Sequence, residues 1–349
     1  MSWQGIEGHD DVLAKFRAML VGGRLASTYL FVGPSGVGKR TFALRLAQTL
    51  LCPKRDPAEM NPCGVCDACL QVLAGTHPDL LRVAKPTDRS AIPVDLIIGP
   101  KERRMQEGLC HDISLKPFMG GRRVAIIEDA DDLNEEGANA LLKTLEEPPP
   151  RSVMILIGTS PDRQLPTIRS RSQLMRFRPL DAELIARLLL SQGTVSEPAD
   201  AERIAAQCGG SLTQAVEMAD PALTRFRHEL VAQLADGTFD NVAFAKLLIA
   251  LVEEAGKEAP PRRARMRQVI TMAIQFYREL LRAMSGAPAV EESAVASVDR
   301  ALTTGRFDPD NVSQMIERCL EALEHVDRNA HQAALLECWL DDLSQLAQA

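Results

Sequence analysis

A glycine-rich loop that ends in a lysine is the first feature of the sequence that could do chemistry. Residues 33–41 read GPSGVGKRT, follow the apolar run 29–32, and lead into a helical pattern that begins near Lys39. In this strand–loop–helix context a G-x-x-x-x-G-K sequence cradles phosphate, because its glycines let the backbone aim N–H groups inward. The helix N-terminus adds a partial positive charge, and the lysine reaches the outer phosphates. The sequence therefore predicts a site that can hold ATP or ADP, built from Gly33, Gly36, Gly38, Lys39, Arg40 and Thr41.

One position of this loop departs from the usual pattern. The Ser or Thr that should follow the lysine and hold Mg²⁺ is Arg40, and the nearest hydroxyl belongs to Thr41, one residue later. A shift of one residue turns a helical side chain by about 100°, so Thr41 is not expected to replace it. The loop argues against Mg²⁺ binding and leaves open whether the site is active, weakened or only a scaffold.

Two acidic residues, Glu128 and Asp129, end a second buried strand pattern. In P-loop ATPases one carboxylate at this place joins the Mg²⁺ shell and its neighbour orients the attacking water. The usual order is Asp then Glu, and here it is reversed, which moves each carboxylate by one methylene; hydrolysis tolerates about 1 Å of misplacement poorly. The alternative is that acids here cap the next helix, which Asp131 or Asp132 could do.

A third strand, 153–157, leads to Thr159, a candidate sensor of the γ-phosphate.

Four cysteines lie within eighteen residues, at Cys52, Cys63, Cys66 and Cys69. Overlapping C-x-x-C steps present pairs of thiolates to one ion, and four thiolates suit tetrahedral Zn²⁺. A thioredoxin-like pair or merely buried thiols are the alternatives, and the spacing favours structural zinc. The remaining cysteines, Cys110, Cys208, Cys319 and Cys338, are expected to be small buried apolar residues.

The elements that must position these residues alternate between apolar strands and helices as far as residue 178. Such alternation around a P-loop predicts an α/β fold, with a parallel sheet covered on both faces. A basic helix is expected over 101–109. After Pro179 the pattern becomes all-α, with short helices to 219 and longer ones to the end. No cluster of residues in this part suggests a metal, nucleotide or catalytic site. We interpret this helical part as an assembly domain.

Composition limits the class of protein. The chain has 349 residues, which suggests two or three domains, and a net charge of −7, which argues against a surface that binds nucleic acid everywhere. Aromatic residues are only 4% of the sequence, too few for stacked platforms that bind single strands. No run approaches the ~20 apolar residues of a membrane span, and no signal-peptide pattern begins the sequence. A cytoplasmic protein without membrane partners is expected.

The order of several motifs resembles that of a known family. They are the P-loop, the cysteine segment, HPD at 77–79, NALLK at 139–143, LEEPP at 145–149 and TIRSR at 167–171. This order resembles the bacterial clamp-loader subunits of the AAA+ group. Within that group it is more similar to the delta-prime family of DNA polymerase III than to the tau/gamma family. Strong local matches cover residues 24–178.

The resemblance implies three domains and a set of partners. They are an AAA+ P-loop core over 1–178 with the zinc module at 52–69, a helical lid over 179–220, and a helical collar for oligomerisation over 221–349. The implied partners are tau/gamma and delta subunits in a hetero-pentameric ring, with the beta sliding clamp and primed DNA reached through the complex. The implied process is DNA replication.

The resemblance also assigns a role to Arg171. The family's Ser-Arg-Cys motif places an arginine in the ATP site of the neighbouring subunit, and here that motif reads Ser170-Arg171-Ser172. An arginine supplied in trans is worth about 10³–10⁵ in rate in comparable phosphoryl-transfer systems. A surface arginine between two serines is the alternative, and the position of Arg171 after 165–168 favours the catalytic finger.

The departures from the family pattern all concern catalysis in the chain's own site. They are Arg40, the inverted Glu128–Asp129 pair, and Thr213 where active loaders carry an arginine in Gly-Ser-x-Arg. The first hypothesis is a stator subunit with little or no intrinsic ATPase. It would be part of a DNA-directed DNA polymerase holoenzyme, which acts as a nucleotidyltransferase. An active ATPase motor of the tau/gamma type and a non-replicative zinc-binding adaptor remain alternatives.

Overall fold

The computed structural model describes residues 3–86, 89, 91–119, 121–237, 240–287, 292–328 and 330–348. The chain divides into two compact units, Met1–Ala219 and Asp220–Ala349. The first unit contains both the expected nucleotide-binding core and the expected lid, so the division into three domains stays a prediction. The predicted outer bounds, residues 1 and 349, lie outside the described residues.

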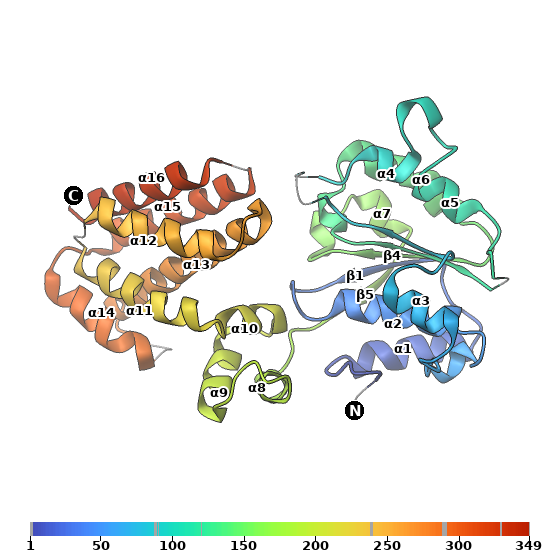
Figure 1. Ribbon diagram of the computed structural model, residues 1–349, viewed down its shortest axis with the longest axis horizontal. Helices are drawn as coiled ribbons and strands as arrows, with labels where there is room; N and C mark the ends of the chain where they lie inside the picture. The colour runs from blue at the N-terminus through green and yellow to red at the C-terminus, as the bar shows by residue number, and fades with distance from the viewer. Residues whose placement is uncertain are drawn as a thin grey trace. The chain divides into compact units, whose positions relative to one another are not determined.

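A parallel sheet of five strands runs through the first unit (Figure 1), in the order β2-β3-β4-β1-β5. The strands are β1 (Thr28–Val32), β2 (Leu80–Val83), β3 (Arg123–Ile127), β4 (Ser152–Ile157) and β5 (Gln173–Arg176). Every residue of β1, β3 and β4 is buried, as expected for strands that are covered on both faces. The predicted parallel α/β sheet is confirmed.

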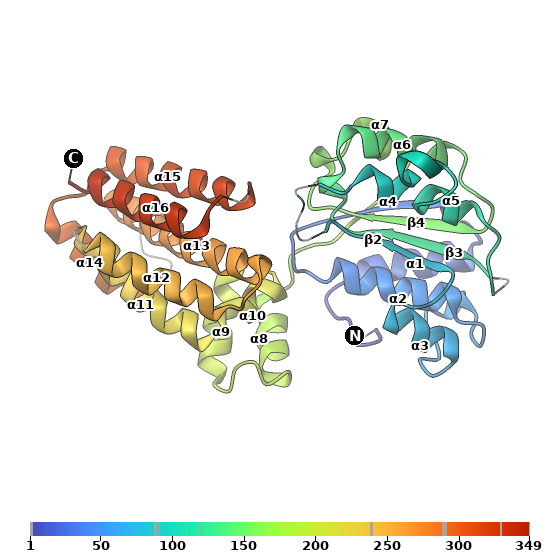
Figure 2. The ribbon, with the colours of Figure 1, turned by 45° about the horizontal axis from the view of Figure 1, so that its top comes forward.

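Helices cover both faces of this sheet, as Figure 2 shows. Because strand side chains alternate between the faces, Tyr29 and Phe31 belong to one core, and Leu30 and Val32 to the other. The first core is shared with α1 (Asp10–Val21), α2 (Lys39–Leu51) and α3 (Asp67–Ala74). The second is shared with α4 (Val94–Ile98), α5 (Leu109–Ser114), α6 (Glu135–Glu146) and α7 (Pro166–Ser170). Short 3-10 segments join these elements: η1 (Pro57–Glu59), η2 (Lys101–Arg103), η3 (Ala130–Asp132) and η4 (Pro161–Arg163).

Short helices follow the sheet in the first unit: α8 (Ala182–Ser191), α9 (Pro198–Gln207) and α10 (Leu212–Met218). They share a small apolar core of their own, which includes Leu180, Ile185 and Ile204. The short helices predicted between Pro179 and residue 219 are confirmed.

The described residues of the second unit form helices and the loops that connect them. Its helices are α11 (Pro221–Asp236), α12 (Asn241–Glu254), α13 (Ala259–Met284), α14 (Glu292–Thr304), α15 (Pro309–Asp327) and α16 (Gln332–Leu346). One apolar core joins them, and within it Nε1 of Trp339 lies 3.4 Å from Sγ of Cys319. Cys319, Cys110 and Cys208 are buried as predicted, whereas Cys338 is exposed, so the prediction for that residue is wrong. The described helices include none with the length and apolarity that a membrane span requires.

The helix expected over 101–109 is wrong. Within that range η2 covers three residues and α5 begins only at Leu109. Between them Met105 and Gly108 adopt positive φ angles of 62° and 89°, which interrupt a helix. A Cβ on Gly108 would lie 2.5 Å from the backbone N of Gly99, because the chain folds back on itself. The basic side chains Arg103 and Arg104 pair with Glu107 and Glu136.

Candidate functional site

The glycine-rich loop connects β1 to α2, as the sequence predicts. Gly36 and Gly38 adopt φ angles of 76° and 98°, which residues with a Cβ rarely adopt. A Cβ on Gly36 would lie 2.2 Å from Oγ of Ser211, and one on Gly33 would lie 2.2 Å from the carbonyl oxygen of Phe177. Gly38 precedes α2 and supplies no side-chain cap. The first N–H groups of that helix therefore suit an anion.

The side chain of Lys39 folds over this loop. Its Nζ donates to the carbonyl oxygens of Gly33 at 2.5 Å and of Pro34 at 2.6 Å. Burial lowers the pKa of Lys39 from 10.5 to about 8, and the negative charge of Asp131 opposes this effect. A phosphate bound in the loop would supply the counter-charge that this desolvated ammonium lacks.

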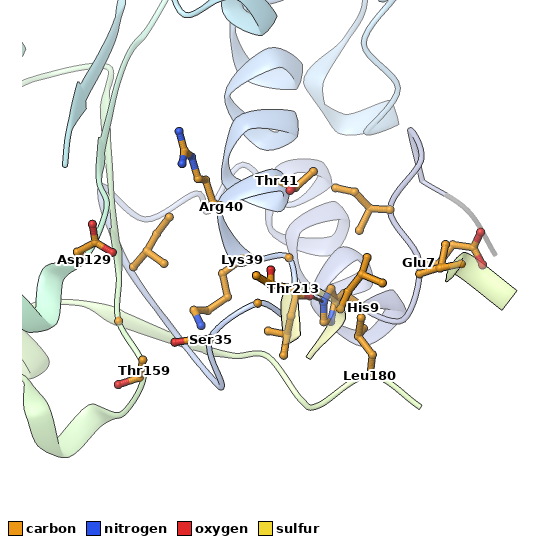
Figure 3. A pocket seen from close by; sticks show the side chains of 18 of the residues that line it. Glu7, His9, Ser35, Lys39, Arg40, Thr41, Asp129, Thr159, Leu180 and Thr213 are labelled. Carbon is orange, nitrogen blue, oxygen red and sulfur yellow. Dashed lines mark hydrogen bonds between the residues drawn. The ribbon is translucent and has the colours of Figure 1, made fainter. Parts of the chain in front are cut away.

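A cleft of about 610 Å³ opens at the loop. This volume lies within the range of small-molecule sites, roughly 300–1,000 Å³. In Figure 3 Ser35 and Lys39 lie between Thr159 on one side and His9 and Leu180 on the other. The lining includes the predicted residues Gly36, Gly38, Lys39, Arg40, Thr41, Asp129 and Thr159; of the other predicted nucleotide-site residues, Gly33 and Glu128 do not line it.

Glu128 is buried and faces two arginines. Nε of Arg40 lies 3.0 Å from Oε2 of Glu128, and Nε and Nη2 of Arg82 donate to Oε1 at 3.0 and 2.7 Å. Both carboxylate oxygens are therefore held by guanidinium groups. Sequence reasoning missed Arg82 because it lies on β2, 46 residues before Glu128.

Asp129 is the exposed acid of the predicted pair and lines the cleft. Its φ angle is 54°, in the left-handed region that Asp tolerates better than most residues. Partial burial and the charge of Asp132 raise the pKa of Asp129, and Lys85 opposes that shift. The two acids thus have different surroundings, Glu128 paired and Asp129 open to the cleft.

Asp131 organises the far side of the cleft. Its Oδ2 accepts from the backbone N of Thr159 at 2.8 Å and from Oγ1 of Thr159 at 2.5 Å. Its Oδ1 accepts from Nε2 of Gln164 at 2.6 Å. The interpretation of Asp131 as a cap of the next helix is wrong, because Asn134 caps α6. No local pattern could have revealed partners 28 and 33 residues away.

The segment expected to act as a lid contacts the loop through its backbone. The N–H groups of Leu212 and Thr213 donate to the carbonyl oxygen of Gly36 at 3.1 and 3.5 Å. The side chain of Thr213 lines the cleft where active loaders are expected to carry an arginine. His9, which the sequence did not single out, lies with its Nε2 2.6 Å from the carbonyl oxygen of Val37 and supports the loop from the other side.

The four clustered cysteines come together in space. One ligand atom from each of Cys52, Cys63, Cys66 and Cys69 lies within 4.8 Å of all the others. The Sγ atoms of Cys63 and Cys69 are 3.9 Å apart, near the ~3.8 Å that tetrahedral Zn–S bonds of about 2.3 Å require. Backbone N–H groups, that of Val65 first, lower the pKa of Cys63 to about 6. Burial raises the pKa of Cys69. The cluster could hold a metal ion and fits zinc.

Arg171 lies at the end of α7 and is not part of the lining of the described cleft. Its Nη2 is 2.6 Å from Oε1 of Glu146, and its Nη1 donates to the carbonyl oxygen of Thr167 at 3.2 Å. About a third of the side chain is exposed. The structure therefore separates Arg171 from Lys39 and leaves it at the surface.

Comparisons with known proteins agree with the motifs. The family described as "DNA polymerase III, delta subunit" matches residues 8–181. The chain is 38% identical over 194 residues to "DNA polymerase III subunit delta'" of Pseudomonas aeruginosa, an alignment that covers 55% of this chain and 56% of that protein. It is 33% identical over 226 residues to "DNA polymerase III subunit gamma/tau" of Mycobacterium bovis, covering 64% of this chain and 37% of that protein. The chain thus spans little more than half of the first relative and about a third of the second.

A solved structure of a gamma subunit-related protein from Thermotoga maritima is also similar, with a TM-score of 0.45 and 13% sequence identity. The alignment covers 97% of this chain and 100% of that chain. The resemblance to the delta-prime family that the motifs indicated is confirmed by the sequence matches. Residues 8–181 of the chain belong to the DNA polymerase III delta-subunit family.

Proposed function

We propose that the chain is a clamp-loader subunit of the delta-prime type in DNA replication. In this role it is a stator: it hydrolyses little or no ATP itself and donates Arg171 to the ATP site of a neighbouring tau/gamma subunit. With tau/gamma and delta subunits it forms a hetero-pentameric ring that loads the beta sliding clamp on primed DNA. The second unit acts as the collar of that ring.

The contrast between Arg171 and Glu128 carries this proposal. Glu128, the acid expected to serve Mg²⁺, has both oxygens held by Arg40 and Arg82. Arg171 instead lies at the surface with one partly exposed carboxylate, Glu146, as its ion-pair partner. An ion pair of this kind is worth about 0–1 kcal/mol, so the guanidinium can exchange it for a phosphate. The chain is thus equipped to assist hydrolysis elsewhere better than in its own cleft.

Zinc has a structural place in this proposal. The cysteines come from the end of α2, the following loop and α3. A zinc ion held by four thiolates has no open coordination position and would fasten this loop to the two helices.

The test is reconstitution of the ring with tau/gamma and delta, followed by measurement of its DNA-stimulated ATPase. Arg171→Ala should assemble normally and lower the rate, because the site that receives the finger loses about 10³ or more in turnover. Lys39→Ala, which alters only the chain's own cleft, should leave the rate nearly unchanged. Equal rates for wild type and Arg171→Ala would reject the proposed role.

An active motor of the tau/gamma type is the second candidate. The observation that favours it is Asp129, which is exposed on the cleft that Lys39 also lines. This candidate requires that the purified chain hydrolyses ATP and that the Lys39→Ala substitution abolishes this hydrolysis. Absence of turnover above background would remove this candidate.

A further inference from the structure

Arg40 stands where a P-loop usually places the hydroxyl that holds Mg²⁺. It lines the cleft, and its Nε lies 3.0 Å from Oε2 of Glu128, the buried acid expected in the metal shell. A guanidinium therefore connects the helix that follows the loop to the acid that ends β3.

We propose that the cleft binds a nucleoside di- or triphosphate without a divalent cation, with the Arg40 guanidinium supplying the positive charge that a metal would bring. This inference concerns the chain's own cleft and is independent of the role of Arg171.

The acid that a P-loop usually offers to a divalent cation is not free here. Arg40 and Arg82 occupy both oxygens of Glu128, so a metal would have to displace a guanidinium from a buried carboxylate. The nearest hydroxyl on the helix cannot help. Figure 3 shows Thr41 and the Arg40 guanidinium on different sides of α2.

Two acids beside the cleft are already paired with cations. Glu128 faces two guanidinium groups, and Asp132 pairs with Nζ of Lys85 at 2.7 Å. Asp129 stays open to the cleft, so a metal would find one exposed carboxylate in place of the expected pair of acids.

Arg40 has the donors that this role requires. Its side chain is 61% exposed, and Glu128 is contacted through Nε. Among the described residues no hydrogen-bond partner is present for its two terminal nitrogens. A planar guanidinium binds phosphate oxygens through two parallel N–H donors. Arg40 can therefore keep its ion pair with Glu128 through Nε and present its two terminal nitrogens to a phosphate.

Calorimetric titration of the full chain with ADP and with ATP, in magnesium and in EDTA, tests the inference. The wild type should bind with dissociation constants that agree within about threefold in the two buffers. Arg40→Ser should weaken binding in EDTA by about tenfold or more, since a charge-assisted contact is lost. Magnesium should restore part of that loss, because the variant regains a hydroxyl after the lysine.

Two controls make the result specific. Arg45→Ser changes an arginine of the same helix, whose Nη1 bonds to Oε1 of Gln48 at 2.9 Å outside the cleft, and should bind as the wild type does. Lys39→Ala should lose binding in both buffers. Unchanged melting temperature and zinc content would show that each variant is folded.

Three results would overturn the inference: no nucleotide binding by the wild type, binding that requires magnesium, or an Arg40→Ser variant that binds as well as the wild type in EDTA. None of them affects the ring experiment with Arg171.

Discussion

Nη2 of Arg171 lies 2.6 Å from Oε1 of Glu146, at the surface of the first unit. The two residues come from the ends of α7 and α6, so the sheet-covering helices present the arginine in a defined place. Both side chains are at least a third exposed, and such pairs are weak because water and salt screen them. Glu146 thus positions Arg171 without binding it tightly.

Replacing Glu146 by Ala should therefore change little. The free energy of unfolding should fall by no more than about 1 kcal/mol, as measured by urea denaturation of the full chain. The ATPase of the reconstituted ring should stay near the wild-type rate. A loss as large as that of Arg171→Ala would mean that the pair acts as a unit.

Lys39 should give the chain a pH dependence. Its pKa falls from 10.5 to about 8 on folding because it is buried, so the unfolded chain binds more protons between those values. The free energy of unfolding should therefore rise with pH from about 8 to 10.5. At about 1.36 kcal/mol per pKa unit the rise is at most roughly 3 kcal/mol. Lys39→Met should lack this rise, as denaturation at several pH values will check.

Asp131 should matter more for stability than its neighbour Asp132. Asp131→Asn places an amide N–H₂ group where a carboxylate oxygen accepts from Thr159 or Gln164, and a donor left facing a donor costs about 1–3 kcal/mol. Asp132→Asn removes only a partly exposed ion pair with Lys85 and should cost less than about 1 kcal/mol. Equal effects in thermal unfolding would contradict this ranking.

The cysteine cluster predicts one zinc ion per chain. Metal analysis of freshly purified protein should find it, and a Cys66→Ser/Cys69→Ser variant should lose it because half of the thiolates are gone. Cys338→Ser, which changes a lone exposed cysteine, is the matched control and should keep the metal. Protein without zinc would reject this site.

Acid should release that zinc, because protons compete with the metal for the thiolates. We expect the metal content after dialysis to fall as the pH is lowered, because each protonated thiol is lost as a ligand.

The sheet and the loop could be predicted because their signals are local. The strand that ends at Val32 and the helix that begins at Lys39 follow from a few consecutive residues. The cysteine cluster is likewise short-range, with all four residues between 52 and 69.

The contacts that define the cleft could not be predicted, because they join distant parts of the chain. Glu128 meets Arg40 and Arg82 only because β2 and β3 are neighbours in the sheet and α2 begins beside their ends. The prediction of a helix over 101–109 was wrong for a different reason. Its charges suggested a helix, but the backbone of Met105 and Gly108 lies in the left-handed region, where the chain turns back.

The most direct test compares Arg171→Ala with Arg169→Ala in the reconstituted ring. Arg169 lies on the same helix and forms a similar surface pair, with Nη1 3.1 Å from Oδ1 of Asp162. The measurement is the rate of ATP hydrolysis with primed DNA present. Arg171→Ala should lower that rate while Arg169→Ala matches the wild type. Equal rates for the two variants would contradict the assignment of Arg171 as the catalytic finger.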